Sequence, residues 1–110
     1  MNIIDPEKIE EAITDKTCAI MPVHVFSSAC DVVRIQQIAC KHGLKVIYDA
    51  AHAQCVQVSG KSIMSYGDVS CASFHATKLF NTCEGGACFI GDEDVAARLR
   101  RMRFFGFDEQ

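Results

Sequence analysis

The first half of the chain carries a strand, a helix and a second strand in close succession, which leaves few folds open to it. Residues 17–24, TCAIMPVH, are a short apolar run with a proline near the end, typical of a buried strand that opens into a loop. Asp31 can cap a helix over 32–42, where apolar residues recur on one face, and Gly43 ends it. Residues 44–49, LKVIYD, form the next expected strand. This βαβ unit predicts parallel strands covered by helices.

Further elements are expected on both sides of this unit. Asp5 and Pro6 mark the start of a short amphipathic helix. Its expected apolar positions are Ile4, Ile9 and Ile13. Residues 50–68 are predicted to be a long irregular connection, with turns at Ser59-Gly60 and Gly67-Asp68, and such connections are often functional.

The last third of the chain predicts two more strands and a helix. VSCASF at 69–74 and GGACFIG at 85–91 are the expected strands. A helix from about residue 92 to 102 follows. Its inward positions are expected to be Val95, Leu99 and Met102. The chain of 110 residues is therefore predicted to be one α/β unit with a mostly parallel sheet and flanking helices.

Charge and hydropathy exclude two classes of partner. A net charge of -3, with basic residues clustered only in ARLRRMR at 97–103, argues against a nucleic-acid binder, and we expect that cluster to be a solvated helix face. No apolar run approaches the roughly 18 residues of a membrane span, and the start MNIIDPEKIE lacks signal-peptide features. We therefore expect a cytoplasmic protein with no nucleic-acid or membrane partner.

The seven cysteines form no CxxC pair. Five of them lie beside apolar residues and are expected to be small buried thiols: Cys18, Cys40, Cys55, Cys71 and Cys88. Zinc is the alternative, with Cys40 and His42 or Cys83 and Cys88 as ligands. Neither pair has a second pair at finger-like spacing, so no metal is expected.

Polar side chains follow the expected strands at the edge where open α/β sheets bind ligands. These are His24, Asp49 and the run SFHATK at 73–78. An acid and a lysine at neighbouring strand ends suit pyridoxal phosphate (PLP), which needs a Schiff-base lysine and a carboxylate beside its pyridinium nitrogen. A salt bridge or a solvated surface pair would need no cofactor, and the spacing alone leaves these alternatives open.

The literal residues add a specific resemblance. KVIYDAAHA at 45–53, GKSIMSYGD at 60–68, SFHATKLFN at 73–81 and EGGA at 84–87 occur in this order. Together they resemble the central stretch of the DegT-type (DegT/DnrJ/StrS) sugar aminotransferases, PLP enzymes of the aspartate aminotransferase fold (fold type I). The resemblance runs from about residue 5 to 107. It implies that residues 1–110 are part of the PLP-binding large domain, without the family's N-terminal segment and C-terminal small domain.

The resemblance also implies roles for the site residues. Lys78 would be the Schiff-base lysine and would shuttle the proton between substrate carbon and cofactor, while Asp49 would pair with the pyridine nitrogen. His52 would lie near the phenolic oxygen, Ala51 against the ring face, and Ser73 on the phosphate. The competing interpretations are a turn cap for Asp49, a core hydroxyl for Ser73 and a structural loop histidine for His52.

Residues outside this set have weaker expectations. Asn81 and Glu84 lie in the family's loop after the lysine, where residues approach the active site of the partner subunit, and Gly85-Gly86 would allow a tight turn there. His75 is expected to orient the loop, and His24 to support the site.

The chain departs from the family pattern where the family usually has glycine. Ser27 stands at one such position and Gln54-Cys55 at the other. If these positions are left-handed, each replacement costs about 1 kcal/mol. The missing segments would leave sheet edges uncovered, which favours a homodimer or other self-association.

The function that follows is transfer of an amine from an amino acid such as glutamate, through PLP, to a nucleotide-linked keto sugar. Lysine at 78 argues against the family's dehydratase branch, which has histidine there. We expect little or no turnover from this short chain alone, because catalysis depends on groups held by the missing segments. The alternative is a non-catalytic remnant or self-associating module of the same fold.

Overall fold

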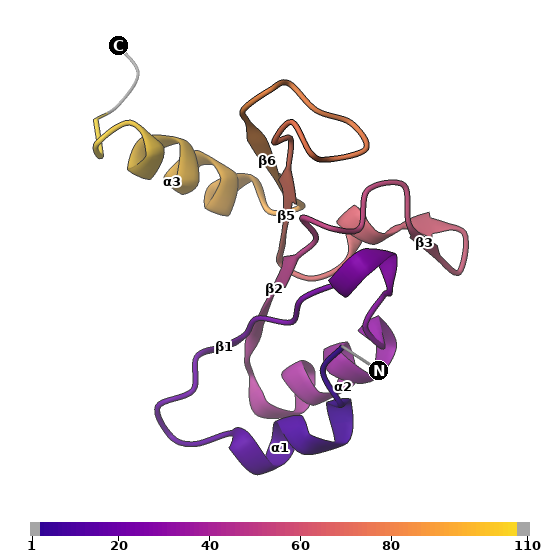
Figure 1. Ribbon diagram of the computed structural model, residues 1–110. Coiled ribbons are helices and arrows are strands. Elements are labelled where there is room, and N and C mark those ends of the chain that lie inside the picture. The colour runs from indigo at the N-terminus through magenta and orange to yellow at the C-terminus, as the bar shows by residue number, and fades with distance from the viewer. Residues whose placement is uncertain (1–2, 108–110) are drawn as a thin grey trace.

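The computed structural model describes residues 3–107, which form an α/β unit around a small sheet (Figure 1). In chain order its elements are η1 (Pro6–Lys8), α1 (Ile9–Ala12), β1 (Ala19–Ile20), η2 (Val25–Ser27), α2 (Val32–His42), β2 (Lys45–Asp49), β3 (Gln57–Val58), β4 (Lys61–Ser62), η3 (Ile63–Ser65), β5 (Val69–Ser73), β6 (Gly86–Ile90) and α3 (Glu93–Arg103).

The main sheet has the strand order β1-β2-β5-β6. β1, β2 and β5 run parallel, and β6 runs antiparallel to β5. The predicted mostly parallel sheet is therefore confirmed. The first strand is shorter than the expected 17–24, because beyond Ile20 only Val23 bridges to Asp49.

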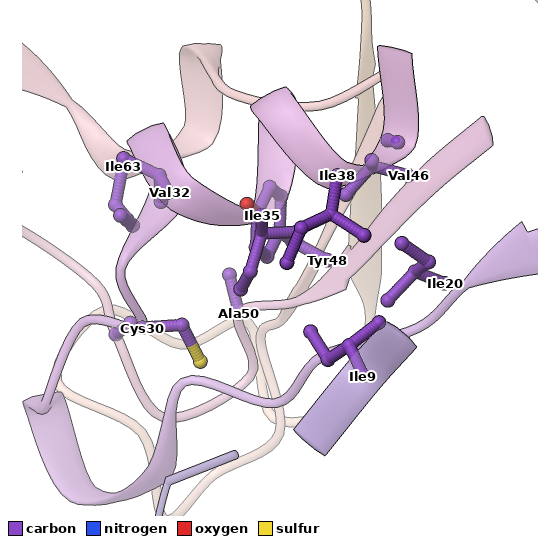
Figure 2. Close-up of a cluster of buried hydrophobic side chains, with 12 residues drawn as sticks. Ile9, Ile20, Cys30, Val32, Ile35, Ile38, Val46, Tyr48, Ala50 and Ile63 are labelled. Atoms are coloured by element: carbon purple, nitrogen blue, oxygen red, sulfur yellow. The ribbon is translucent and has the colours of Figure 1, made fainter. Parts of the chain in front are cut away.

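The signals for α2 act as predicted. The Asp31 carboxylate accepts a hydrogen bond from Arg34 N at 2.9 Å, and Gly43 ends the helix in the left-handed region with φ 65°. One face of α2 is buried, and Figure 2 shows Ile35 and Ile38 lying beside Tyr48 and Val46 of β2. Burying a large aliphatic side chain contributes about 1.5–3 kcal/mol, so this layer is a main source of stability.

The hydrophobic core belongs to the first 63 residues (Figure 2). Its buried members are Ile9, Ile20, Cys30, Val32, Ile35, Ile38, Ala39, Val46, Tyr48, Ala50, Ala53 and Ile63. The first helix is mostly a 3-10 turn capped by Asp5, followed by a single α-turn, so only Ile9 of the three expected isoleucines is buried. Ile4 is exposed and Ile13 only half-buried.

The connection over 50–68 contains more regular structure than expected. Ser59 and Gly60, both with positive φ, turn the chain between β3 and β4, which pair antiparallel. Gly67 follows η3 with φ 77°, and a Cβ there would lie 2.8 Å from the Tyr48 ring and 2.9 Å from Val46 O. Glycine is therefore required at this second turn, both for its backbone angle and for close packing.

None of residues 74–107 is buried. The prediction that three side chains of α3 point inward is therefore wrong. Leu99 is 38% exposed, Met102 is 74% exposed, and Val95 is only half-buried. Figure 1 shows α3 beside the β5–β6 hairpin and apart from α1 and α2. The radius of gyration, 14.9 Å, exceeds the roughly 13 Å of a compact domain this long.

The expectation of buried thiols is also wrong for most cysteines. Cys18, Cys40, Cys55 and Cys88 are exposed and Cys71 is half-buried, whereas Cys30 is buried. Apolar neighbours in sequence do not determine which face of an element a side chain occupies. Among residues 3–107 no group of three or more metal-ligating side chains comes together. Within the same range, no helix is long and apolar enough to cross a lipid bilayer.

Candidate active site at the strand ends

The parallel topology places Asp49 and Ser73 at the same edge of the sheet, because each ends one of two adjacent parallel strands, β2 and β5. Asp49 N donates to Pro22 O at 3.0 Å, and Ala50 N donates to Cys71 O at 2.8 Å. These bonds fix the backbone on both sides of the acid.

The Asp49 carboxylate has two distinct oxygens. Oδ1 accepts a hydrogen bond from Ala51 N at 3.0 Å, which is the turn cap considered above. Oδ2 has no hydrogen-bond partner among the residues that the structure describes. The turn-cap role therefore uses one oxygen and leaves the second available to a ligand.

A cavity of about 350 Å³ lies beside this edge. It brings together three of the predicted residues, Ala51, His52 and Lys78, while Asp49 and Ser73 do not line it. Its other lining residues are Phe26, Ser27, Gln54 and Leu79. Ligand sites typically measure about 300–1,000 Å³, so this cavity has the size of a small one.

Lys78 is held through its backbone rather than through its amine. Its N–H donates to His75 O at 2.9 Å, and Asn81 Nδ2 donates to Lys78 O at 3.3 Å. Between residues 3 and 107 the ammonium group has no hydrogen-bond or ion-pair partner. Lys78 lines the cavity, and within the described residues no salt bridge competes for its amine.

Gln54 joins the strand end to the lysine loop, a role that the sequence did not reveal. Its Nε2 donates to Ser73 O at 2.8 Å and to Phe80 O at 2.9 Å, and its Oε1 accepts from Phe80 N at 2.6 Å. The sequence drew attention to Gln54 only because Gln54-Cys55 stand where the family usually has a glycine. No local pattern signals this role, because its partners lie 19 and 26 residues away.

Phe26 is a second residue that sequence reasoning missed. Its ring stacks on His52 with centroids 5.4 Å apart and planes 5° apart. Ser27 ties the two loops together, since its N and Oγ both donate to His52 O at 2.9 and 3.2 Å. The only signal was an aromatic residue directly after PVHV.

The backbone is left-handed at both places where the family usually has glycine. Ser27 has φ 63° and Cys55 has φ 64°. Phe26, next to Ser27, also has a positive φ of 47°. Such angles are strained for residues with a Cβ, and strain of this kind is concentrated at functional sites.

The loop after β5 holds the remaining candidates. Ser73 Oγ accepts from His75 N at 3.3 Å, so its hydroxyl proton is left for another acceptor. His75 contacts Thr77 Oγ1 at 2.9 Å and lies 3.8 Å from the Glu84 carboxylate. Asn81 and Glu84 are exposed and do not line the cavity, so the structure does not bring them to Lys78's amine.

His24 lies below the site and is fully buried. Cys30 N donates to its Nδ1 at 3.0 Å, so the neutral tautomer carries its proton on Nε2, and the ring stacks on Tyr48. Burial lowers the pKa of His24, against the opposing charge of Asp49. Nε2 has no partner among residues 3–107. His24 is therefore a neutral support beneath the end of β2.

Comparisons with known proteins identify relatives in sequence and in fold. The chain is 49% identical over 103 residues to dTDP-4-amino-4,6-dideoxy-D-glucose transaminase of Shigella dysenteriae, covering 94% of this chain and 28% of that protein. The crystal structure of DesI with its TDP-sugar product superposes with a TM-score of 0.94 at 41% identity, covering 98% of this chain and 28% of DesI. The crystal structure of NtdA from Bacillus subtilis, with bound cofactor PMP, superposes with a TM-score of 0.82 at 38% identity. The match covers 93% of this chain and 23% of NtdA.

The chain thus spans less than a third of the length of the relatives it matches. The sequence model of the DegT/DnrJ/EryC1/StrS aminotransferase family matches residues 2–110. With a cavity lysine and a strand-end acid on the same fold, the chain belongs to the DegT/DnrJ/EryC1/StrS aminotransferase family.

Proposed function

We propose that this chain is the PLP-binding part of an aminotransferase that acts on nucleotide-linked keto sugars. The observation that carries the proposal is Lys78, whose amine has no hydrogen-bond or ion-pair partner among residues 3–107, and which lines a cavity with Ala51 and His52 beside the strand that ends in Asp49. Residues 1–110 correspond to a portion of the large domain. These residues span about 28% of the length of the relatives, so the rest of the substrate cleft would come from the part of the relatives' length that they do not span.

The residues present fit PLP in their chemistry. Lys78 offers an amine without an ion pair, Asp49 has one carboxylate oxygen free of protein partners in the described range, and Ser73 has a hydroxyl proton to donate. These are the three groups needed for a Schiff base, for a protonated ring nitrogen and for a phosphate contact. Ala51, with its small side chain, leaves room against a ring face.

When bound, PLP supplies an electron sink that stabilises charge at the substrate carbon. Lys78 would be the residue that holds the cofactor covalently, and its amine would carry the proton to and from that carbon. The Asp49 carboxylate stabilises positive charge at the ring nitrogen. Gln54 binds the backbone of Ser73 and of Phe80, so it holds the loop that carries Lys78 beside the end of β5. His52, which stacks on Phe26, would contact the ring's phenolic oxygen.

The substrate class rests on the relatives, whose names carry dTDP- and TDP-linked sugars. We infer the same class here, with an amino acid such as glutamate as donor. A homodimer would bring Asn81 and Glu84 of one chain toward the site of the other. Turnover by the isolated chain is expected to be weak or absent, since the cavity is open: Phe26 and Leu79 are 75% and 78% exposed.

Borohydride trapping tests the cofactor site. The chain is incubated with PLP, reduced and mapped by mass spectrometry. We expect the adduct at Lys78, loss of that adduct in Lys78→Ala, and weaker labelling in Asp49→Asn. The matched control is Lys61→Ala, which removes an exposed lysine of the β3–β4 hairpin and should leave the Lys78 adduct unchanged. Labelling spread evenly over surface lysines would rule out a built site.

The open cavity also favours the second candidate, a non-catalytic module of the same fold. The two are separated by offering the PLP-loaded chain glutamate and then a dTDP-linked keto sugar. Formation of the amino sugar supports the enzyme. A Lys78 adduct without any amine transfer supports the binding module.

A further inference from the structure

Two cysteines face each other across the antiparallel strands β5 and β6. Cys71 and Cys88 are direct register partners, and their sulfur atoms lie 3.7 Å apart. The residues before and after each cysteine are also paired in the same register, Ser70 with Phe89 and Ala72 with Ala87. The pair is therefore held by the sheet itself.

This arrangement meets the geometric requirement for a disulfide. Directly opposite residues of antiparallel strands have Cα atoms about 4.5–5.5 Å apart. Disulfides span Cα separations of about 4.4–6.8 Å. The backbone already provides the needed distance, so closing the bond requires only rotation of the two side chains.

The pair is open to small molecules. Cys71 and Cys88 line a groove of about 580 Å³ between the β5–β6 hairpin and α3. Cys88 is exposed and Cys71 half-buried. Arg100 and Arg103 of α3 line the same groove.

We propose that Cys71 and Cys88 are a redox pair that hydrogen peroxide converts to a cross-strand disulfide. The Cys88 thiolate attacks one peroxide oxygen, giving a sulfenic acid and hydroxide. The Cys71 thiol then attacks the Cys88 sulfur, and water leaves. In total the two thiols lose two protons and two electrons, and one hydrogen peroxide molecule becomes two water molecules.

The order of the two steps follows from the surroundings of each thiol. Burial raises the pKa of Cys71 to about 11, and the Cys88 thiol and Asp49 act in the same direction. Cys71 is therefore a neutral thiol near pH 7 and a poor first nucleophile. Cys88, at the exposed side of the pair, meets the oxidant first, and Cys71 resolves the product.

The two cysteines lie close to the sheet edge that carries Asp49 and Ser73. The proposed disulfide does not depend on cofactor binding. Cys71 is also the register partner of Asp49 on β2, so Asp49, Cys71 and Cys88 form a row across three strands. Ser73 lies two residues beyond Cys71 on the same face of β5.

Differential alkylation tests the proposal on the 110-residue chain. The reduced chain is treated with one equivalent of hydrogen peroxide, blocked with iodoacetamide, reduced, labelled with N-ethylmaleimide and mapped. We expect the second label on Cys71 and Cys88 in equal amounts, the first label on the other five cysteines, and an intact mass before reduction lower by two hydrogen atoms. A second label spread over all cysteines, or absent from this pair, overturns the proposal.

Two single variants and a matched control complete the test. In Cys71→Ser, the Cys88 sulfenic acid should persist and be trapped by dimedone, whereas in Cys88→Ser, Cys71 should stay reduced. Cys83→Ser removes another exposed cysteine and should leave the Cys71–Cys88 bond unchanged. The same oxidation in urea should lose its selectivity. Selectivity that survives unfolding would show that the sheet does not bring the thiols together, and would overturn the proposal.

Discussion

Single residues near the candidate site carry backbone strain that the sequence suggested and the structure located. Ser27 and Cys55 both adopt left-handed angles where glycine would be unstrained. At Ser27 a hydrogen bond offsets part of the strain, because its Oγ donates to His52 O. Cys55 is exposed, so the strain there has less local compensation.

Replacing Cys55 with glycine should therefore stabilise the chain. Relief of the left-handed strain raises the free energy of unfolding by about 1–2 kcal/mol. Glycine also increases the conformational freedom of the unfolded chain, which lowers the free energy of unfolding by about 0.4–1 kcal/mol. We expect a net gain of about 0.5–1 kcal/mol in the free energy of unfolding, measured by urea denaturation. Cys55→Ala removes the same thiol but keeps the strain, so it should change little. Equal gains in both variants would assign the effect to the thiol.

At the residue scale, the sequence predicted the lysine and the acid but not the groups that position them. Lys78 and Asp49 stand out because their residue types and strand-end positions suit one chemistry. Gln54 and Phe26 act through partners distant in the sequence, Ser73 and Phe80 for Gln54 and His52 for Phe26. Local patterns carry no information on such pairs.

Short elements in this fold rely on contacts with longer ones. α1 has a single turn and cannot be stable on its own. Glu10 connects it to the last turn of α2, where Lys41 Nζ lies 2.6 Å and His42 Nε2 2.8 Å from the Glu10 carboxylate. These hydrogen bonds hold the pKa of Glu10 at about 2, below its usual 4.5.

This contact predicts an acid-sensitive contribution to stability. The folded pKa of Glu10 is lower than the unfolded one, so its contribution is complete above about pH 4.5 and is lost as the pH falls toward about 2. Urea denaturation at several pH values should show the free energy of unfolding decreasing across this window. Glu10→Gln should have a shallower decrease. The control Glu11→Gln alters an exposed acid of the same helix and should keep the full slope; an unchanged slope in Glu10→Gln would contradict the assignment.

At the scale of the whole molecule, the two halves of the chain differ in burial. The core lies within residues 9–63, whereas β6 and α3 have no buried residue. Figure 1 shows α3 apart from the helices that cover β2. Local stability should follow this division, because opening free energies are lowest where few apolar side chains are buried.

Hydrogen exchange measures this directly. We expect the amides of α3 to exchange faster than those of α2, although both helices have 11 residues and a side-chain N-cap. Their matched length and capping make α2 the internal control for helix propensity. Equal protection of the two helices would mean that α3 is covered, for example by a second copy of the chain. Repeating the measurement at several protein concentrations distinguishes that case.

The amino-acid sequence alone was enough to predict the order of the main elements, the caps of α2 and the mostly parallel sheet, and it suggested Lys78 and Asp49 as groups suited to a cofactor. These depend on periodicity, capping and turn residues, which act over a few positions of the chain. The folded chain was needed to show that Cys71 faces Cys88, that Gln54 joins two loops and that α3 lacks a covering layer. These depend on burial and on contacts between segments far apart in sequence, which only the packing of the whole fold determines.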